Sequence, residues 1–301
     1  TKANRISEKA KHPFAFEDFL WYVYKRKAAW EVRLMKVILS RKGFDSKYGG
    51  CPSPILPDGT LLSLPIPSDD RDAYSDLCCH DINYADLLRQ LRPKKEYSHC
   101  HVDPDLRPSL RTSSVDGWKP AFGQTDAARG VHKNAGVEVG DLFLFFGWFR
   151  QAELGPNGYR FARKSDDFYR YANLQVIYGY LQIGKILTDP KEIAKYHWHP
   201  HASQKYLENH ANTLYLPAEH LSWDPQKNGY GTLDYRSDRV LTLENKGRAT
   251  WKEKPFLMPE HVYGNRKNSA KGAGIYYAGV WQELVLDESD GLLDWAKSII
   301  E

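Results

Sequence analysis

The segment LFLFFGWF, at residues 142–149, constrains the fold of this chain more than any other stretch. It is almost wholly apolar and aromatic, and so short a run is typical of a buried strand rather than of a membrane span. The Gly-Asp pair at residues 140–141 predicts a turn just before it. A second long strand is predicted at residues 174–187, where Gly179 and Gly184 indicate bends or bulges.

Shorter strand and helix patterns surround these two segments. A hairpin turn is predicted at LGPNGY, and a helix over residues 123–136 is expected to end near Asn134, because Asn and Gly fit a left-handed helix end. Further helices are predicted at residues 72–91 and 292–300. Further strands are predicted at residues 35–40, 60–68, 160–163, 212–217, 239–243, 274–280 and 281–286. The pattern predicts an α+β fold with many short strands.

Length and composition indicate how the chain is organised. Its 301 residues suffice for one large domain or two modest ones. We expect residues 1–34, which carry apolar side chains at helical spacing, to form an appended helix, and residues 35–301 to form a single domain. Four cysteines do not make a disulfide framework in so long a chain, and the first residues lack the apolar stretch of a signal peptide. A cytoplasmic protein with no membrane contact is the simplest interpretation.

The charge permits nucleic-acid binding but does not argue for it. The net charge is only +4. The basic excess is local, with nine Lys or Arg against four Asp or Glu at residues 236–271, and six against three at residues 89–111. Such stretches fit either phosphate contact or an ordinary solvated face. The many aromatic side chains supply core volume, and some offer flat surfaces on which a base can stack.

Polar residues gather in the loop that follows the first predicted strand. Arg41 and Lys42 would neutralise a phosphate, and Asp45 is a candidate base or ribose-hydroxyl acceptor. The glycines at 49 and 50 let backbone N–H groups approach a ligand closely. The spacing of a phosphate-binding Walker loop or of a dinucleotide fingerprint is absent. A turn-rich loop with one salt bridge explains the same residues equally well.

Histidines and carboxylates form three further candidate clusters. HCHVDPDLR, at residues 99–107, can bind a metal or transfer protons, although Asp-Pro-Asp also favours a turn. The upstream CCHD segment at residues 78–81 suggests a zinc site in combination with this cluster, but it lacks the Cys-x-x-Cys pairing typical of zinc, so no metal ligand is assigned and the cofactor stays open. Gln124 and His132, two helical turns apart, are expected on one face of a helix. The alternating histidines in HWHPH, at residues 197–201, predict a metal or phosphate cluster or simply an exposed loop.

Two resemblances arise from these segments. VGDLFLFFGWFRQ and LQVIYGYLQIGKIL resemble the strand pattern of PUA-like domains of the ASCH and EVE groups, which implies a partly barrel-like sheet that binds RNA or a modified base. The ordered series MKVILSRKGFDSKYGG, PSPILPDGTLLSLPIP, HVDPDL, GQTDAARGVH, GDLFLFFGWFR, HWHPH and NTLYLP resembles the third type of nucleotide-modification-associated domain, found in bacteria and phages. The combined prediction is an α+β fold whose mixed, partly barrel-like sheet has flanking helices.

The second resemblance implies a protein that acts on a nucleotide or nucleic acid in DNA hypermodification or phage defence, alongside other DNA-modification proteins. The recurring polar positions of the family fall here on Arg41, Asp45, Ser53, Asp103, Asp105, Gln124, His132, Asp141, Arg150, His199 and His201. The predicted catalytic residues are Asp45, Asp103, Gln124 and His132. The predicted nucleotide contacts are Arg41, Ser53, Asp105, Trp148, Phe149, Arg150, His199 and His201, with only one of the two aromatic rings facing the pocket. The alternative is a reader that binds a modified base without chemistry.

Overall fold

The computed structural model describes residues 35–264, 275–277, 279, 282–286 and 289–301. The helix predicted within residues 1–34 lies outside the described residues, as does part of the strand predicted at residues 274–280. None of the helices in the described part is long and apolar enough to cross a membrane.

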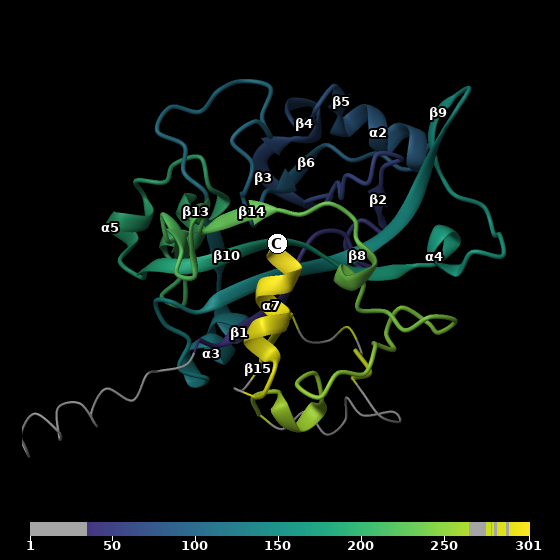
Figure 1. Cartoon of the computed structure of the whole chain (residues 1–301). Coiled ribbons are helices and arrows are strands. Elements are labelled where there is room, and N and C mark those ends of the chain that lie inside the picture. Colours follow the sequence, from purple (N-terminus) through teal and green to yellow (C-terminus); the bar gives the residue numbers. More distant parts are fainter. Residues whose placement is uncertain (1–34, 265–274, 278, 280–281, 287–288) are drawn as a thin grey trace, which may run out of the picture. The chain divides into compact units, whose positions relative to one another are not determined.

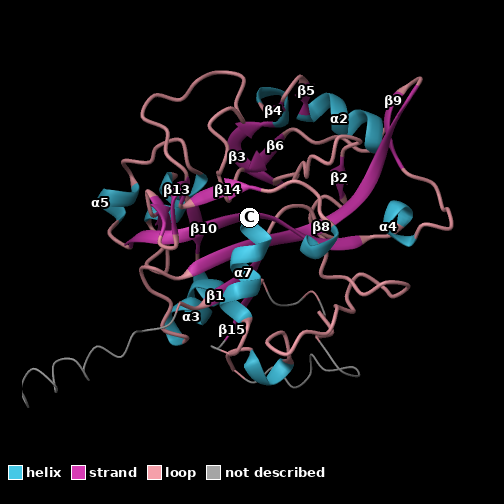
Figure 2. Ribbon diagram, viewed as in Figure 1, coloured by secondary structure: helices cyan, strands magenta, loops and turns pink. Residues whose placement is uncertain are grey.

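A nine-stranded mixed sheet forms the centre of the fold (Figures 1 and 2). Its path runs through β15 (Glu283–Leu286), β1 (Val37–Arg41), β8 (Leu142–Gly155), β10 (Leu174–Leu187), β11 (Thr213–Pro217) and β7 (Phe122–Gln124). Off this path, β2 (Ser53–Ile55) and β9 (Gly158–Phe161) pair with β8, and β14 (Tyr230–Thr232) pairs with β10. The β1 and β2 strands run parallel to β8, whereas the other pairs are antiparallel.

Small two-stranded sheets and short helices surround the main sheet. The small sheets pair β3 (Ile66–Ala73) with β6 (His99–His101), β4 (Cys78–Cys79) with β5 (Ile82–Asn83), and β12 (His220–Leu221) with β13 (Asp224–Asn228). The α-helices are α2 (Tyr84–Leu91), α3 (Asp126–Asn134), α4 (Phe168–Tyr171), α5 (Pro190–Ile193), α6 (Gln204–Leu207) and α7 (Leu292–Ile300). The 3₁₀ turns are η1 (Tyr74–Asp76), η2 (Pro200–Ala202), η3 (Ser237–Arg239) and η4 (Pro259–His261).

Both faces of the central strands are buried, and β1 shows how. Val37 and Leu39 belong to the same core cluster as Trp295 of α7, and α7 packs against β1 (Figure 1). Ile38, one residue along, faces the opposite core together with Phe143. Because a strand that is buried on both faces needs apolar side chains at successive positions, its sequence reads as a run and not as an alternation.

The sheet curls into a partial barrel, in agreement with the predicted fold class. The two ends of the strand path, β15 and β7, come together: the Gln124 side chain on β7 donates a hydrogen bond of 2.5 Å to Glu283 on β15. The α3 helix contacts β15 at the same place. The curl therefore brings side chains from opposite ends of the strand path into one interior region.

The predicted central elements are confirmed. The β8 and β10 strands and the α7 helix lie where the sequence predicts them, and α3 ends at Asn134 as predicted, although residues 123 and 124 of the predicted helix belong to β7. The register of β10 shifts next to Gly179 and again next to Gly184, so both expected irregularities are present.

The helix predicted at residues 72–91 is wrong over its first half. Only Tyr84–Leu91 is α-helical, because Asn83 caps the helix by accepting hydrogen bonds from two backbone N–H groups in its first turn. Before it, β4 and β5 form a hairpin around His80, whose φ is 52°. The strand predicted at residues 60–68 is also shifted: only Leu61 makes an isolated bridge before β3 begins at Ile66.

The prediction of a strand at residues 239–243 is wrong, because these residues make only isolated bridges. Val240 bridges to Val176 and Thr242 to Trp251, so each residue pairs alone with a different segment. A ladder needs successive residues to pair with one partner strand, and these do not.

Candidate functional site

Glu283 lies at the centre of a buried hydrogen-bond network that closes the curled sheet. Its Oε1 atom accepts hydrogen bonds from Ser40 Oγ at 2.9 Å and from Gln124 Nε2 at 2.5 Å. Its Oε2 atom lies 3.0 Å from His132 Nε2, and His132 Nδ1 lies 2.9 Å from the Tyr215 hydroxyl. Only 1% of the Glu283 side chain is exposed, so these partners replace water around the carboxylate.

Lys42 joins this network to a second carboxylate. Its Nζ atom lies 3.8 Å from Glu283 Oε1 and 3.7 Å from Asp103 Oδ2, and it sits 4.2 Å from the centre of the Phe122 ring. Ser40 and Lys42 both reach Glu283 because residues two apart on an extended segment point to the same side. The end of β1 thus supplies a hydroxyl and an ammonium group to the interior.

The two carboxylates remain ionised although they are buried. Burial acts to raise the pKa of Glu283, but the neighbouring His132 and Lys42 and the hydrogen bonds to the carboxylate outweigh it and lower the pKa. Burial also acts to raise the pKa of Asp103, and the neighbouring His199 imidazole and Lys42 ammonium lower it well below its usual range. The site therefore holds two buried negative charges with one ammonium group between them.

Three histidines surround Asp103. His101 comes from β6, whereas His199 and His201 come from the start of η2 and from η2 itself. The Nε2 atom of His199 lies 3.3 Å from Asp103 Oδ1. The ligand atoms of His101, Asp103 and His201 all lie within 4.8 Å of one another. Burial lowers the pKa of His201 to about 3, so its imidazole is neutral at physiological pH.

Gly123, in the middle of β7, lies between Asp103 and His201. Its N–H group donates a hydrogen bond of 2.7 Å to Asp103 Oδ1. A Cβ atom at this position would overlap the His201 ring, so the close approach of strand and imidazole requires glycine. The β7 strand therefore contributes to both halves of the site, through Gly123 and through Gln124.

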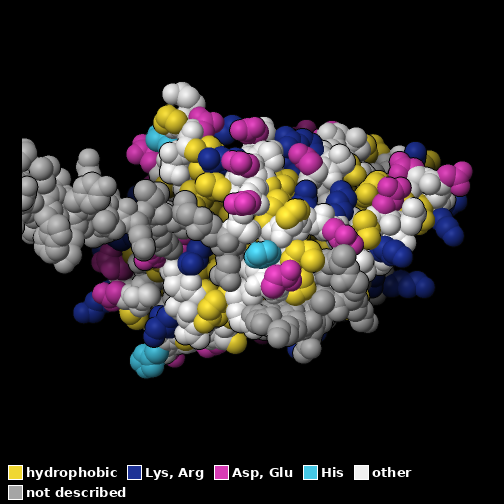
Figure 3. All heavy atoms as spheres, turned by 60° about the horizontal axis from the view of Figure 1, so that its bottom comes forward, with side chains coloured by type: hydrophobic (Ala, Val, Ile, Leu, Met, Phe, Trp, Pro, Cys, Tyr) yellow, Lys and Arg dark blue, Asp and Glu magenta, His cyan; other side chains and the backbone are white. Residues whose placement is uncertain are grey.

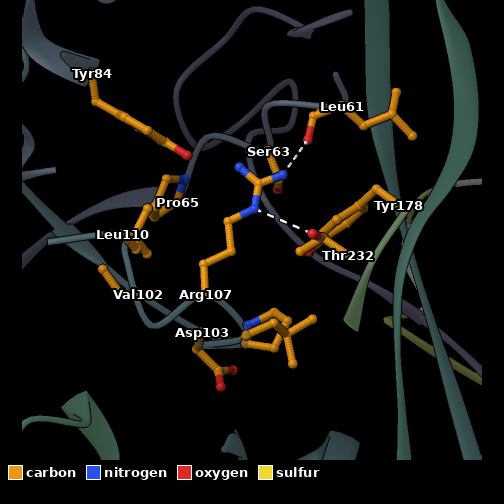
Figure 4. A pocket seen from close by; sticks show the side chains of 12 residues that line it. Leu61, Ser63, Pro65, Tyr84, Val102, Asp103, Arg107, Leu110, Tyr178 and Thr232 are labelled. Atoms are coloured by element: carbon orange, nitrogen blue, oxygen red, sulfur yellow. Dashed lines mark hydrogen bonds between the residues drawn. The ribbon is translucent and has the colours of Figure 1, made fainter. Parts of the chain in front are cut away.

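We call the group Lys42, Asp103, Gln124, His132 and Glu283, with its histidines His101, His199 and His201, the buried polar centre. A small pocket of about 50 Å³ adjoins it at Asp103 (Figure 4). Arg107 crosses this pocket and bonds to Leu61 O and Thr232 Oγ1, while the Asp103 carboxylate points away from the guanidinium group. A larger pocket of about 460 Å³ is lined by Asp70 and His199, among others.

Asp45 lies at a different pocket, of about 280 Å³, which is also lined by Arg41, Trp148 and Arg248. Asp45 accepts a hydrogen bond of 2.7 Å from Arg41 Nη1 and two more from the N–H groups of Lys47 and Tyr48, so it orders its own loop. The Arg248 guanidinium lies 3.9 Å from the centre of the Trp148 ring. We call this the Trp148 pocket.

The other residues predicted to contact a nucleotide lie elsewhere. Ser53 accepts a hydrogen bond from Leu64 N, and Asp105 binds Arg111 and the Trp118 indole inside the protein. Phe149 is completely buried in the core, where its neighbours leave no face for a ligand. Arg150 donates to the backbone oxygen of Ala162.

The structure thus brings together Asp103, Gln124, His132, His199 and His201 among the predicted site residues. Gln124 and His132 do not share a helix face, since Gln124 belongs to β7; they meet because both contact Glu283. Glu283 was missed because a single glutamate in an apolar strand does not stand out in sequence. The only feature that could have identified Glu283 is that a charged residue occupies a position of an apolar strand that faces the interior.

The surface drawn in Figure 3 intermixes acidic and basic side chains. This agrees with the small net charge of +4. The described residues on that face do not form one broad basic patch of the kind that binds nucleic acid by charge alone.

The fold and site define a class of protein: an α+β domain with a curled mixed sheet that encloses ionised carboxylates, a lysine and histidines. The chain belongs to the nucleotide modification associated domain 3 family, whose model matches residues 36–287. This membership associates the protein with nucleotide modification. No curated protein and no solved structure gives a match.

Proposed function

We propose that this protein is an enzyme that modifies a nucleotide or a nucleic-acid base, with the buried polar centre as its catalytic site. The observation that carries the proposal is the Lys42 ammonium group, held 3.7 and 3.8 Å from two ionised carboxylates inside the protein. Burying several charges is costly, and such groups are concentrated at functional sites. The family's association with nucleotide modification gives the substrate class.

Each group at the centre has a chemical role in the proposal. Asp103, 3.3 Å from His199 and 3.7 Å from Lys42, stays ionised and stabilises positive charge that develops on the reacting group. Lys42 stabilises negative charge that develops on the substrate. Glu283, which accepts a hydrogen bond from Gln124, holds His132 and Lys42 in place from the other side.

The test is a search for modified nucleosides in cells that express the protein. DNA, RNA and the nucleotide pool are digested and compared by mass spectrometry for the wild type, Asp103→Asn and the control Asp81→Asn. Asp81 is exposed and lies in the β4–β5 turn. We expect a new nucleoside mass with the wild type and Asp81→Asn and its absence with folded Asp103→Asn. A product that persists in Asp103→Asn would remove the catalytic role of this residue.

A second candidate function, recognition of a base without chemistry, is favoured by the Trp148 pocket. It combines an aromatic ring with two arginines, Arg41 and Arg248, which suits stacking and phosphate contact. Nucleotide binding measured for Trp148→Ala and Asp103→Asn separates the two functions. Lost binding in Trp148→Ala together with unchanged nucleosides in all expressing cells would favour the reader.

A further inference from the structure

The three histidines around Asp103 differ in tautomer, and their hydrogen bonds determine which nitrogen of each is available. His201 Nδ1 lies 2.7 Å from Asn212 Oδ1. The Asn212 amide is oriented by its own Nδ2 group, which donates 3.0 Å to the His201 carbonyl. Because Oδ1 can only accept, Nδ1 of His201 carries the proton and Nε2 carries a lone pair.

His101 has the same arrangement with a different partner. Its Nδ1 atom lies 2.7 Å from the Asp70 carboxylate, which is held in turn by Lys205 at 2.8 Å and by Ser68 at 2.9 Å. A carboxylate can only accept here, so the proton again lies on Nδ1 and the lone pair on Nε2. An outer acceptor that fixes Nδ1–H and presents Nε2 is the usual support of a metal-binding histidine.

His199 has the opposite tautomer. Its Nδ1 atom accepts the backbone N–H of His201 at 3.2 Å, so its proton lies on Nε2, which lies 3.3 Å from Asp103 Oδ1. His199 is completely buried, and its Nε2–H has no well-aligned hydrogen-bond acceptor among the described residues. His199 therefore presents a proton and no lone pair toward Asp103, so it is not counted among the metal ligands.

We infer that His101 Nε2, His201 Nε2 and the Asp103 carboxylate form a binding site for a divalent first-row transition-metal ion. One ligand atom from each of the three residues lies no more than 4.8 Å from the other two, and so within about 2.8 Å of a common centre, so a contraction of roughly 0.6–0.8 Å brings the ligands to metal-bond length. Two imidazoles and one carboxylate suit Fe²⁺, Mn²⁺, Co²⁺ or Zn²⁺ and leave coordination positions open, whereas Mg²⁺ and Ca²⁺ prefer oxygen ligands.

The surroundings support this assignment independently of the ligand atoms. The Tyr206 ring stacks on His201 at 4.5 Å, and Gly123 packs on the same imidazole, so its plane is fixed. Gly123 also holds Asp103 Oδ1 through its N–H group. Ligands that are oriented before the ion arrives lose little conformational entropy when they bind it.

The experiment measures Co²⁺ binding to the full chain, prepared without a polyhistidine tag and stripped with EDTA. Co²⁺ is followed by its visible absorption and by calorimetry. We expect one ion per chain, an affinity at least 100-fold lower in His101→Ala, His201→Ala and Asp103→Asn, and no change in His99→Ala. His99 is the matched control, because it is exposed on the same strand as His101. Asn212→Ala keeps all three ligands and should weaken binding 10- to 100-fold.

Two outcomes would overturn the site: no Co²⁺ binding by the folded wild type, or binding that all three ligand variants retain. Where a ligand variant does not fold, the decision rests on Asn212→Ala and on the rise in wild-type melting temperature with Co²⁺, which His99→Ala must share. No nucleotide is present in this measurement. A protein that binds Co²⁺ but modifies no nucleoside would therefore refute the proposed function and leave the metal site standing.

Discussion

Replacing Glu283 with Gln should destabilise the protein strongly, although the change adds or removes no bulk. A carboxylate offers two oxygens to donors on both sides, Ser40 and Gln124 at Oε1 and His132 at Oε2. A glutamine keeps one oxygen and turns an NH₂ group toward donors on the other side. Lys42 also loses one of its two carboxylate neighbours.

The magnitude follows from this loss. Removing one partner of a buried ionic network costs about 3–5 kcal/mol, because the remaining polar groups stay buried without a partner. Urea unfolding at pH 7, followed by tryptophan fluorescence, measures the change in unfolding free energy. Glu96→Gln, at an exposed position, should stay within about 0.5 kcal/mol of the wild type. A cost below about 1 kcal/mol for Glu283→Gln would refute the network.

The stability lost in Glu283→Gln should depend on pH. The folded-state pKa of Glu283 lies below its ordinary value of 4.5, so its carboxylate stabilises the fold fully above that pH. This stability is lost as the pH falls through the lower folded-state pKa. The difference in stability between wild type and Glu283→Gln should therefore shrink on acidification below pH 4.5. A difference that stays constant with pH would show that the charge of Glu283 is not responsible.

Two further predictions concern packing and thiol reactivity. Gly123→Ala should lower the free energy of unfolding by about 1–3 kcal/mol, because the added methyl group meets the His201 ring. Gly130→Ala, in the open middle of α3, should raise the free energy of unfolding by about 0.5–1 kcal/mol, and equal effects of the two substitutions would contradict the packing. In the folded protein Cys78 should react first with a thiol-specific disulfide reagent at pH 8, because it is the one partly exposed cysteine of the four. Cys51 should react more slowly, because burial raises its pKa to about 11. Rapid reaction of all four thiols would refute this prediction.

Local sequence determined the central elements of the fold. The apolar runs at β8 and β10, the glycines that shift the register of β10, and the helical periodicity of α3 and α7 depend on near neighbours, so they can be read directly. The incorrect predictions also concern local structure. Residues 72–83 carry a helical pattern, but Asn83 starts the helix late, and the hairpin before it depends on packing rather than on periodicity.

Tertiary structure alone decided how the site is assembled. Glu283 is 243 residues from Ser40 and 159 residues from Gln124, and they meet only because the sheet curls until β15 and β7 approach each other. The sequence contains His101, His199 and His201, but it does not say which nitrogen of each carries the proton. Asp70, Asn212 and the backbone N–H of His201 make that choice, since an imidazole nitrogen that faces an acceptor carries the proton and one that faces a donor carries the lone pair.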